Sequence, residues 1–114
     1  MTIKETLTYY KKIITTSSGK RLKLLSVLEQ ICEHFDYDVK LGMVNEDFFV
    51  IELPYKITKI NVMLHGDEIS VIVQVTFTKV IYDEKFNAYS KNERKKAIES
   101  LINKLKELGV KNVC

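Results

Sequence analysis

The stretch Glu68 to Lys79, E-I-S-V-I-V-Q-V-T-F-T-K, decides the fold because apolar and polar side chains alternate along it. Every second residue from Ile69 to Phe77 is apolar, and the residues between them are polar except for Ile72. Successive side chains of a strand point to opposite faces of a sheet, so the pattern predicts a strand with one buried face and one mostly polar face. A helix would scatter the same apolar residues around its whole surface.

Three segments that precede this stretch also have the pattern of strands. Apolar residues alternate over 39–44, over 47–53 after a tight hairpin predicted at Asn45-Glu46, and over 57–65. The residues His65-Gly66-Asp67 then predict a turn into the stretch quoted above. Four consecutive strands with short connections pair most simply as an antiparallel meander.

Apolar residues at helical spacing predict helices on both sides of the strands. One helix is predicted over 20–35, after the break T-T-S-S-G at 15–19. Its apolar stripe consists of Leu22, Leu24, Leu25, Leu28, Ile31, Cys32 and Phe35. The clearest helix starts at a capping box formed by Ser90 and Glu93 and ends before Gly109, a residue type favoured just after a helix. Both helices have an apolar side that a sheet can cover.

Two further segments complete the predicted fold. The segment 3–14 has a capping box and apolar residues at helical spacing, but its β-branched and aromatic residues are also compatible with a strand. The residues after Tyr82 are mostly polar through Asn87 and predict a loop. The whole pattern predicts one α+β domain over residues 1–114, a two-layer sandwich in which helices pack on one face of a four-stranded antiparallel meander sheet.

The composition fits a single cytoplasmic domain. The chain has 114 residues, of which 18 are basic and 15 acidic, and this length builds one core. No run of about 18 uncharged apolar residues occurs, and the first residues lack the pattern of a secretory signal, so we expect neither a membrane span nor export. The two cysteines, Cys32 and Cys114, form no framework of spaced pairs, which fits a reducing compartment.

The charges are distributed unevenly along the chain. The net charge is +5 over residues 1–27, −6 over 28–54, zero over 55–89 and +4 over 90–114. Two explanations fit this distribution: the basic ends form an anion-binding face, or they pack beside the acidic segment. The first explanation predicts a phosphate-binding surface near the starts of two helices. The residues of this predicted surface are Ser18, Gly19, Lys20, Arg21, Lys91, Arg94, Lys95 and Lys96.

The sequence has no recognisable catalytic motif. The segment T-T-S-S-G-K-R at 15–21 ends like a phosphate-binding loop, but Ile14 stands where that pattern requires glycine, and Lys20 is followed by arginine. A capped loop with solvated lysines explains this segment without a ligand. No serine lies in a G-x-S-x-G turn. We therefore expect no enzymatic activity and no cofactor, and an enzyme without a recognisable motif is only a third interpretation.

A metal site is not expected either. Cys32, His34, Asp36 and Asp38 are close to one another in the sequence. On a helix, however, residues two apart point in directions that differ by about 200°, so Cys32 and His34 cannot bind one ion together. Cys32 also belongs to the predicted apolar stripe, where it acts as a small buried residue.

The second face of the predicted sheet carries apolar residues that need an explanation. These residues are Phe48, Val50, Met63 and Ile72. Either the segment 3–14 covers them, or another molecule does, or they are scattered exposed side chains of an ordinary sheet. We predict from them a small non-enzymatic binding module that acts through protein–protein contacts as a homodimer. The alternative is an accessory protein that binds nucleic acid through basic helix surfaces at Lys20/Arg21 and Lys91–Lys96.

Overall fold

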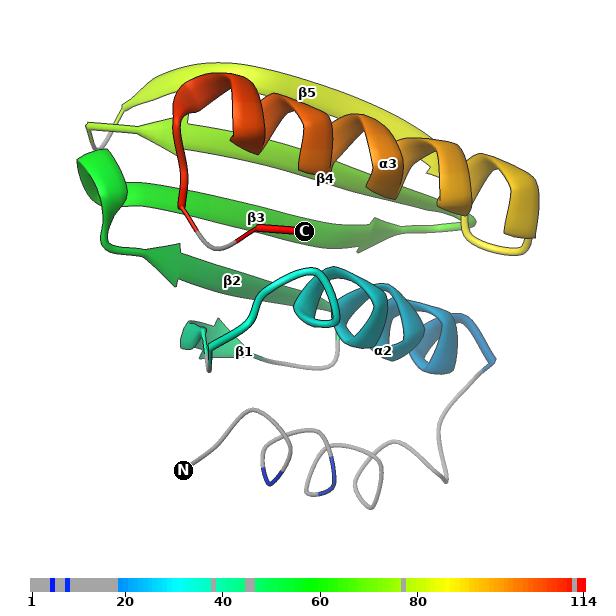
Figure 1. Cartoon of the computed structure of the whole chain (residues 1–114). Helices are drawn as coiled ribbons and strands as arrows, with labels where there is room; N and C mark the ends of the chain where they lie inside the picture. Colours follow the sequence, from blue (N-terminus) through cyan, green and yellow to red (C-terminus); the bar gives the residue numbers. More distant parts are fainter. Residues whose placement is uncertain are drawn as a thin grey trace.

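The computed structural model describes residues 5, 8, 19–37, 39–44, 47–76, 78–111 and 113–114. Within these ranges the chain forms a five-stranded antiparallel sheet and two α-helices (Figure 1). The strands are β1 (Lys40–Val44), β2 (Phe48–Leu53), β3 (Thr58–His65), β4 (Glu68–Val75) and β5 (Lys79–Asn87). The helices are α2 (Gly19–Cys32) and α3 (Lys91–Leu108), and a short 3-10 helix, η1 (Tyr55–Ile57), connects β2 to β3.

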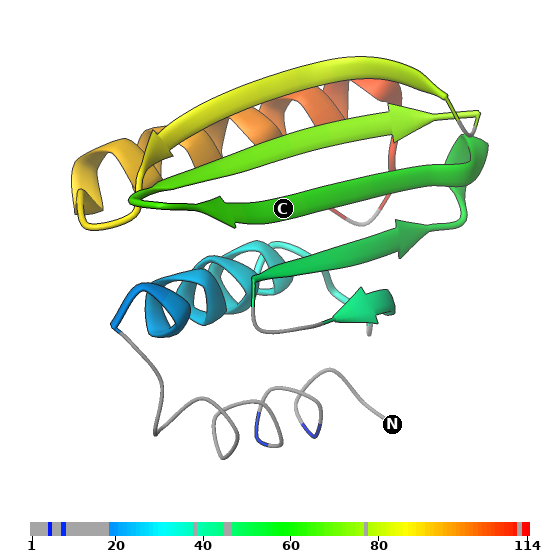
Figure 2. The same cartoon turned by 180° about the vertical axis from the view of Figure 1, so that it is seen from behind.

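The two helices lie on the same face of the sheet (Figure 1), and Figure 2 shows the opposite face from behind. The strands are neighbours in the order in which they occur in the sequence, so the sheet is a meander. The predicted α+β class, with an antiparallel sheet and helices packed on it, is confirmed. We call the face opposite α2 and α3 the outer face.

The alternation along β4 places its apolar residues in the core. Ile69, Val71 and Val73 are at most 1% exposed. In the register with β3, Val71 lies opposite Val62, and Val73 lies opposite Ile60. Directly opposed residues of an antiparallel pair share one face, so these residues form a continuous layer on which the helices pack. Burial of apolar surface, which contributes about 25 cal/mol per Å², is the main term that holds the two layers together.

The prediction of four strands is wrong at one end of the sheet. β4 ends at Val75, the chain turns at Thr76, and β5 then pairs with β4 along its length. Thr76 has a φ of 50°, a left-handed conformation that interrupts a strand. The residues after Tyr82 were predicted to be a loop because they are charged, but charged side chains are also common on a strand at the edge of a sheet. Phe77 lies outside the described residues.

A bulge changes the alternation predicted for β1. The register between β1 and β2 shifts between Leu41 and Met43. Gly42 lies at this shift, and a Cβ atom there would collide with the carboxylate of Glu52. Two further predictions lie outside the described residues: the hairpin at Asn45-Glu46 and, apart from Glu5 and Thr8, the segment 3–14.

α2 is shorter than predicted. It ends at Cys32, and Phe35, which was predicted to belong to the helix, instead forms an antiparallel bridge with Val113. Leu22 was predicted in the buried stripe but is 42% exposed. The stripe residues that are buried are Leu24, Leu25, Leu28, Ile31 and Phe35. The face of α2 that packs in the core is therefore narrower at the start of the helix than the sequence pattern indicated.

Both ends of α3 are capped as predicted. At the start, the Ser90 hydroxyl oxygen accepts a hydrogen bond of 3.2 Å from the N–H of Glu93. At the end, Gly109 has a φ of 89°, and the N–H of Val110 donates to the carbonyl oxygen of Leu105 at 3.1 Å. This geometry satisfies a carbonyl group that a helix end otherwise leaves unpaired. None of the described helices combines the length and the apolar character needed to cross a membrane.

Two substitutions test how α3 is held. Leu101 is fully buried, so Leu101→Ala leaves a cavity, and we expect it to lower the free energy of unfolding by about 2 to 5 kcal/mol. Ser90→Ala removes only the cap acceptor, and we expect a loss of about 1 kcal/mol. Urea unfolding of both variants measures the difference. Equal losses would show that α3 does not pack on the sheet through Leu101.

Candidate functional site

The outer face of the sheet brings together the apolar residues that the sequence grouped. Phe48 of β2 lies directly opposite Met63 of β3, and in the neighbouring row Val50 and Ile72 lie on either side of Asn61. These positions alternate with the buried ones, so their side chains point away from α2 and α3. All four apolar side chains are partly exposed. We call Phe48, Val50, Met63 and Ile72 the apolar patch.

The polar side chains that lie beside the apolar patch are hydrogen-bonded within the sheet or buried. The Asn61 amide nitrogen donates to the amide oxygen of Gln74 at 3.0 Å, across β3 and β4. Ser70, which lies opposite Met63, is only 3% exposed although its polar character predicted contact with water. A polar group that has its hydrogen bond within the sheet is less costly to cover with a partner than an unpaired one. The centre of the outer face is therefore suited to burial.

Positively and negatively charged side chains surround the apolar patch in equal numbers among the described residues. Among the described residues of the outer face, three are lysines and three are carboxylates: Lys40, Lys59, Lys85, Glu52, Glu68 and Asp83. The Lys40 ammonium lies 3.3 Å from the Glu52 carboxylate. The described residues of the outer face thus carry no net charge, and they offer no advantage to a polyanion such as nucleic acid.

The two helix starts where the sequence predicted basic clusters lie at one end of the molecule (Figures 1 and 2). α2 and α3 start at the same end of the sheet in both views (Figures 1 and 2). A hydrogen bond of 3.2 Å from Arg94 Nη1 to Ser26 Oγ joins the first part of α3 to the middle of α2. Lys91, Lys95 and Lys96 are exposed on α3. The start of α2 and the basic first turns of α3 are therefore at the same end of the molecule.

Not every residue of the predicted anion-binding surface is on the surface. Arg94 was predicted to lie beside the exposed lysines, but it is only 5% exposed. It is four residues before Ile98 and seven before Leu101, so it lies on the buried side of α3. Gly19 is the first residue of α2. Ser18 and the side chains of Lys20 and Arg21 lie outside the described part of the chain.

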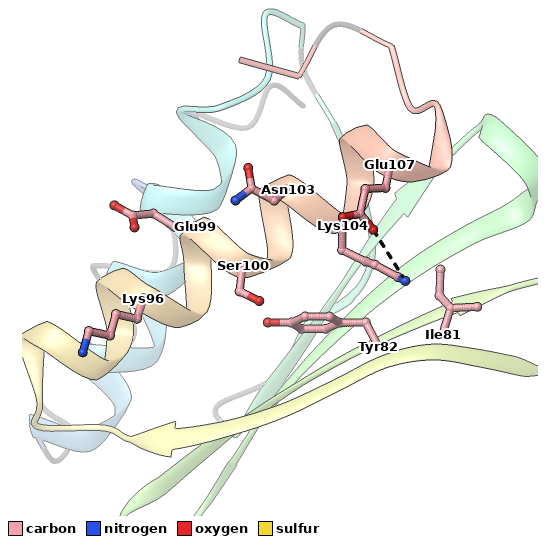
Figure 3. Close-up of a pocket in the computed structure, with 8 residues that line it drawn as sticks. All are labelled: Ile81, Tyr82, Lys96, Glu99, Ser100, Asn103, Lys104 and Glu107. Carbon is pink, nitrogen blue, oxygen red and sulfur yellow. Dashed lines mark ion pairs between the residues drawn. The ribbon is translucent and has the colours of Figure 1, made fainter.

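A groove between β5 and α3, which sequence analysis did not identify, has a volume of about 460 Å³ (Figure 3). Its lining residues are Ile81, Tyr82, Lys96, Glu99, Ser100, Asn103, Lys104 and Glu107. The register of β5 against β4 shifts at Ile81, which turns Ile81 and Tyr82 together toward the helix. The sequence could not reveal this groove because it gave no sign of the bulge.

The Tyr82 hydroxyl in this groove takes part in hydrogen bonds. The Tyr82 hydroxyl donates to the carbonyl oxygen of Ala97 at 3.2 Å. Burial raises the pKa of the Tyr82 phenol above its ordinary value; a hydrogen bond with Ser100 lowers it, and the charge of Glu84 raises it. The phenol is therefore protonated at neutral pH and acts as a donor, not as a base. The Lys104 ammonium lies 3.8 Å from the Glu107 carboxylate at the rim.

A second groove, of about 550 Å³, lies where β2 turns into β3. Its apolar lining residues are Tyr37, Leu53, Pro54 and Ile57. Lys56 and Ile57 have φ values of 51° and 50°, a left-handed conformation that is unfavourable for residues with a Cβ atom. Ile57 is 46% exposed. The turn thus holds an apolar side chain in water on a strained backbone.

The strain in this turn can be measured. Lys56→Gly removes the Cβ atom at φ 51°, and we expect a gain in the free energy of unfolding of about 1 kcal/mol, reduced in part by the greater freedom of glycine in the unfolded chain. Lys59→Gly, within β3, is the matched control and is expected to lower stability by about 0.5 to 1 kcal/mol. A loss of stability in both variants would contradict the left-handed conformation of Lys56.

The cysteine and histidine residues form no metal site within the described ranges. No group of three or more His, Cys, Asp and Glu side chains gathers there. His34 Nδ1 instead lies 2.8 Å from the carbonyl oxygen of Cys114, and the N–H of Cys114 donates to the carbonyl oxygen of His34 at 2.7 Å. These contacts attach the C-terminal residue to the end of α2. Asp38 lies outside the described residues.

Comparisons with known proteins give no family for this chain. No protein-family model matches it, and neither a curated protein nor a solved structure was found to match.

Proposed function

We propose that this protein is a small non-enzymatic binding module that forms a homodimer through the outer face of its sheet. The observation that carries this proposal is the apolar patch, to which three neighbouring strands contribute on the face opposite both described helices. Such a patch with a polar rim has the anatomy of a protein–protein interface. The two cysteines are not joined by a disulfide, which suits the reducing cytoplasm, and we place the module there.

A second copy of the chain is the partner that the charges favour. A two-fold axis brings each surface against itself, so a self-associating face needs both signs of charge in balance. The rim of the outer face meets this requirement with three lysines and three carboxylates among its described residues. On β5, Asp83 and Lys85 project from this face two residues apart. A rotated copy can therefore place an acid of one protomer against a base of the other.

Self-association through the patch predicts the effect of one charge placed within it. Ile72 lies on β4, which has a strand on either side, so Ile72→Lys places an ammonium group where the partner's apolar residues would cover it. We expect the wild type to be a dimer at micromolar concentration in sedimentation velocity, and Ile72→Lys to be a monomer. Tyr89→Lys, which replaces a 51% exposed aromatic residue in the connection between β5 and α3, should leave the dimer intact.

Two results would contradict the homodimer. The first is a wild type that sediments as a monomer throughout the micromolar range. The second is a dimer that Ile72→Lys leaves unchanged, since the interface would then lie elsewhere on the molecule. Loss of the dimer could also result from unfolding of the variant, and unfolding curves of Ile72→Lys test this. We expect the variant to stay folded, because Ile72 is a partly exposed strand position that tolerates lysine.

Nucleic-acid binding is the second candidate, and one observation favours it. The two helices begin at the same end of the molecule, where Lys91, Lys95 and Lys96 are exposed. Helix starts attract phosphate groups through their unpaired N–H groups, and lysines add to this attraction. Such a surface would bind the backbone of a polyanion with little regard to its base sequence.

The salt dependence of binding separates the two candidates. If Lys91, Lys95 and Lys96 contact phosphates, changing all three to glutamine should reduce the slope of log K against log salt by about 0.9 per lost contact on duplex DNA. Glutamine is a good helix former, so α3 should persist. We expect the wild type to bind DNA only well below physiological salt. Tight binding at physiological salt that the triple change abolishes would make nucleic-acid binding the leading function.

A further inference from the structure

β5 forms one edge of the sheet, and no other strand of the described chain lies on its open side. The order of the strands ends at β5, which pairs with β4 alone (Figure 1). With nine residues, β5 is the longest of the described strands. The backbone N–H and C=O groups on the open side of an edge strand are able to pair with a further strand.

The hydrogen bonds between β4 and β5 identify the backbone groups that point to the open side. The N–H of Ala88, the residue after β5, donates to the carbonyl oxygen of Asp67 at 2.7 Å. Hydrogen-bonded and non-hydrogen-bonded pairs alternate along an antiparallel ladder, so Glu84, four residues before Ala88, is also hydrogen-bonded to β4. Asp83 and Lys85, on either side of Glu84, therefore direct their N–H and C=O groups away from β4.

The groove of about 460 Å³ between β5 and α3 lies on the helix side of this edge (Figure 3). A strand added to β5 points every second side chain to the helix side, where the groove is. Ser100 and Asn103 of α3 supply hydrogen-bonding groups there. The edge and the groove together suit a polypeptide in extended conformation, whose backbone pairs with β5 while half of its side chains meet polar groups of α3.

Glu84 determines which side chain of an added strand fits best. It lies opposite the buried Val71, so its side chain is on the helix side, yet it is exposed at the edge. It has no ion pair within the described part of the chain. Toward an added antiparallel strand Glu84 is a non-hydrogen-bonded position, where directly opposed side chains are closest. A lysine or arginine opposite Glu84 therefore forms a favourable cross-strand pair.

A second copy of β5 fits this edge poorly. When a two-fold axis relates two identical antiparallel strands, the residue on the axis lies opposite its own copy. Registers centred on the outward-pointing part of β5 thus place Asp83, Glu84 or Lys85 opposite the same residue. Like charges directly opposite each other destabilise a strand pair, so the charges of this edge favour a strand of different sequence.

We propose that the open edge of β5 binds an extended segment of another protein as an added antiparallel strand, with a basic residue of that segment opposite Glu84. The backbone groups of Asp83 and Lys85 form the hydrogen bonds, and the side chains on the helix side reach the groove beside α3. The binding of this segment goes beyond the homodimer and does not depend on it, because the edge groups point along the plane of the sheet and not out of the outer face.

Capped heptapeptides in which threonine alternates with lysine test this edge, with NMR of the isotope-labelled protein as the measurement. In an extended peptide the lysines share one face, and a peptide with glutamate in their place is the charge control. We expect the lysine peptide to shift the amide signals of Asp83 and Lys85 to a plateau, and the glutamate peptide to bind about fivefold more weakly. Ile72→Lys, which removes the dimer contact, should bind alike. No shift in β5 with the lysine peptide would overturn the proposal, whether or not the protein dimerises.

Methylation of the peptide nitrogens separates strand pairing from simple attraction between charges. With a lysine opposite Glu84, the neighbouring threonines lie opposite Asp83 and Lys85, and their N–H groups bond to β5. Methylation of the threonine nitrogens should therefore abolish binding, whereas methylation of the lysine nitrogens should leave it. Equal binding of the two methylated peptides would contradict strand addition.

Lys85→Pro tests the same contact from the side of the protein. Proline removes the outward N–H, and an edge strand tolerates it where that N–H is not part of the ladder. We expect the affinity for the lysine peptide to fall by about tenfold. Lys85→Thr loses the same charge but keeps the N–H, and it should bind like the wild type. Equal affinities of the two variants would overturn the role of the edge, and the methylated peptides decide the matter should Lys85→Pro fail to fold.

Discussion

The two faces of an antiparallel sheet point in opposite directions, and the two described helices can cover only one of them. The apolar side chains of β4 that face α2 and α3, from Ile69 to Val75, make this the buried face. A shift of one residue in register would exchange the faces, so the packing of the helices also fixes which side chains point outward. The position of the apolar patch and the balance of charges on its rim both follow from this constraint.

The arrangement of the helices has a second consequence. Because α2 and α3 run in the same direction, their starts lie at the same end of the molecule, and residues far apart in the sequence become neighbours. Arg94, near the start of α3, donates a hydrogen bond to Ser26 in the middle of α2, on the side of the sheet opposite the outer face. The described residues thus form two surfaces of different character: a sheet face with an apolar patch and equal numbers of lysines and carboxylates, and a helix end at which Lys91, Lys95 and Lys96 are exposed.

Features that depend on a few consecutive residues could be predicted from the sequence, whereas features that depend on contacts with other strands and helices could not. The alternation in β4 and the capping residues Ser90 and Gly109 identified their elements correctly because each acts within a few residues. β5 was missed because the charges at 83–85 are as typical of an edge strand as of a loop. The burial of Arg94 was missed although its spacing from Ile98 and Leu101 indicated it, because the neighbouring lysines made the turn look exposed.

The central claim is that a second copy of the chain covers the outer face, and the accessibility of single methyl groups tests it most directly. A soluble paramagnetic chelate broadens the NMR signals of methyl groups that it can approach. In dilute protein it should broaden the signals of Val50 and Ile72, and in concentrated protein these signals should be protected, while those of Leu22, 42% exposed on α2, should be broadened equally in both. Equal broadening of Ile72 at all concentrations would contradict the claim.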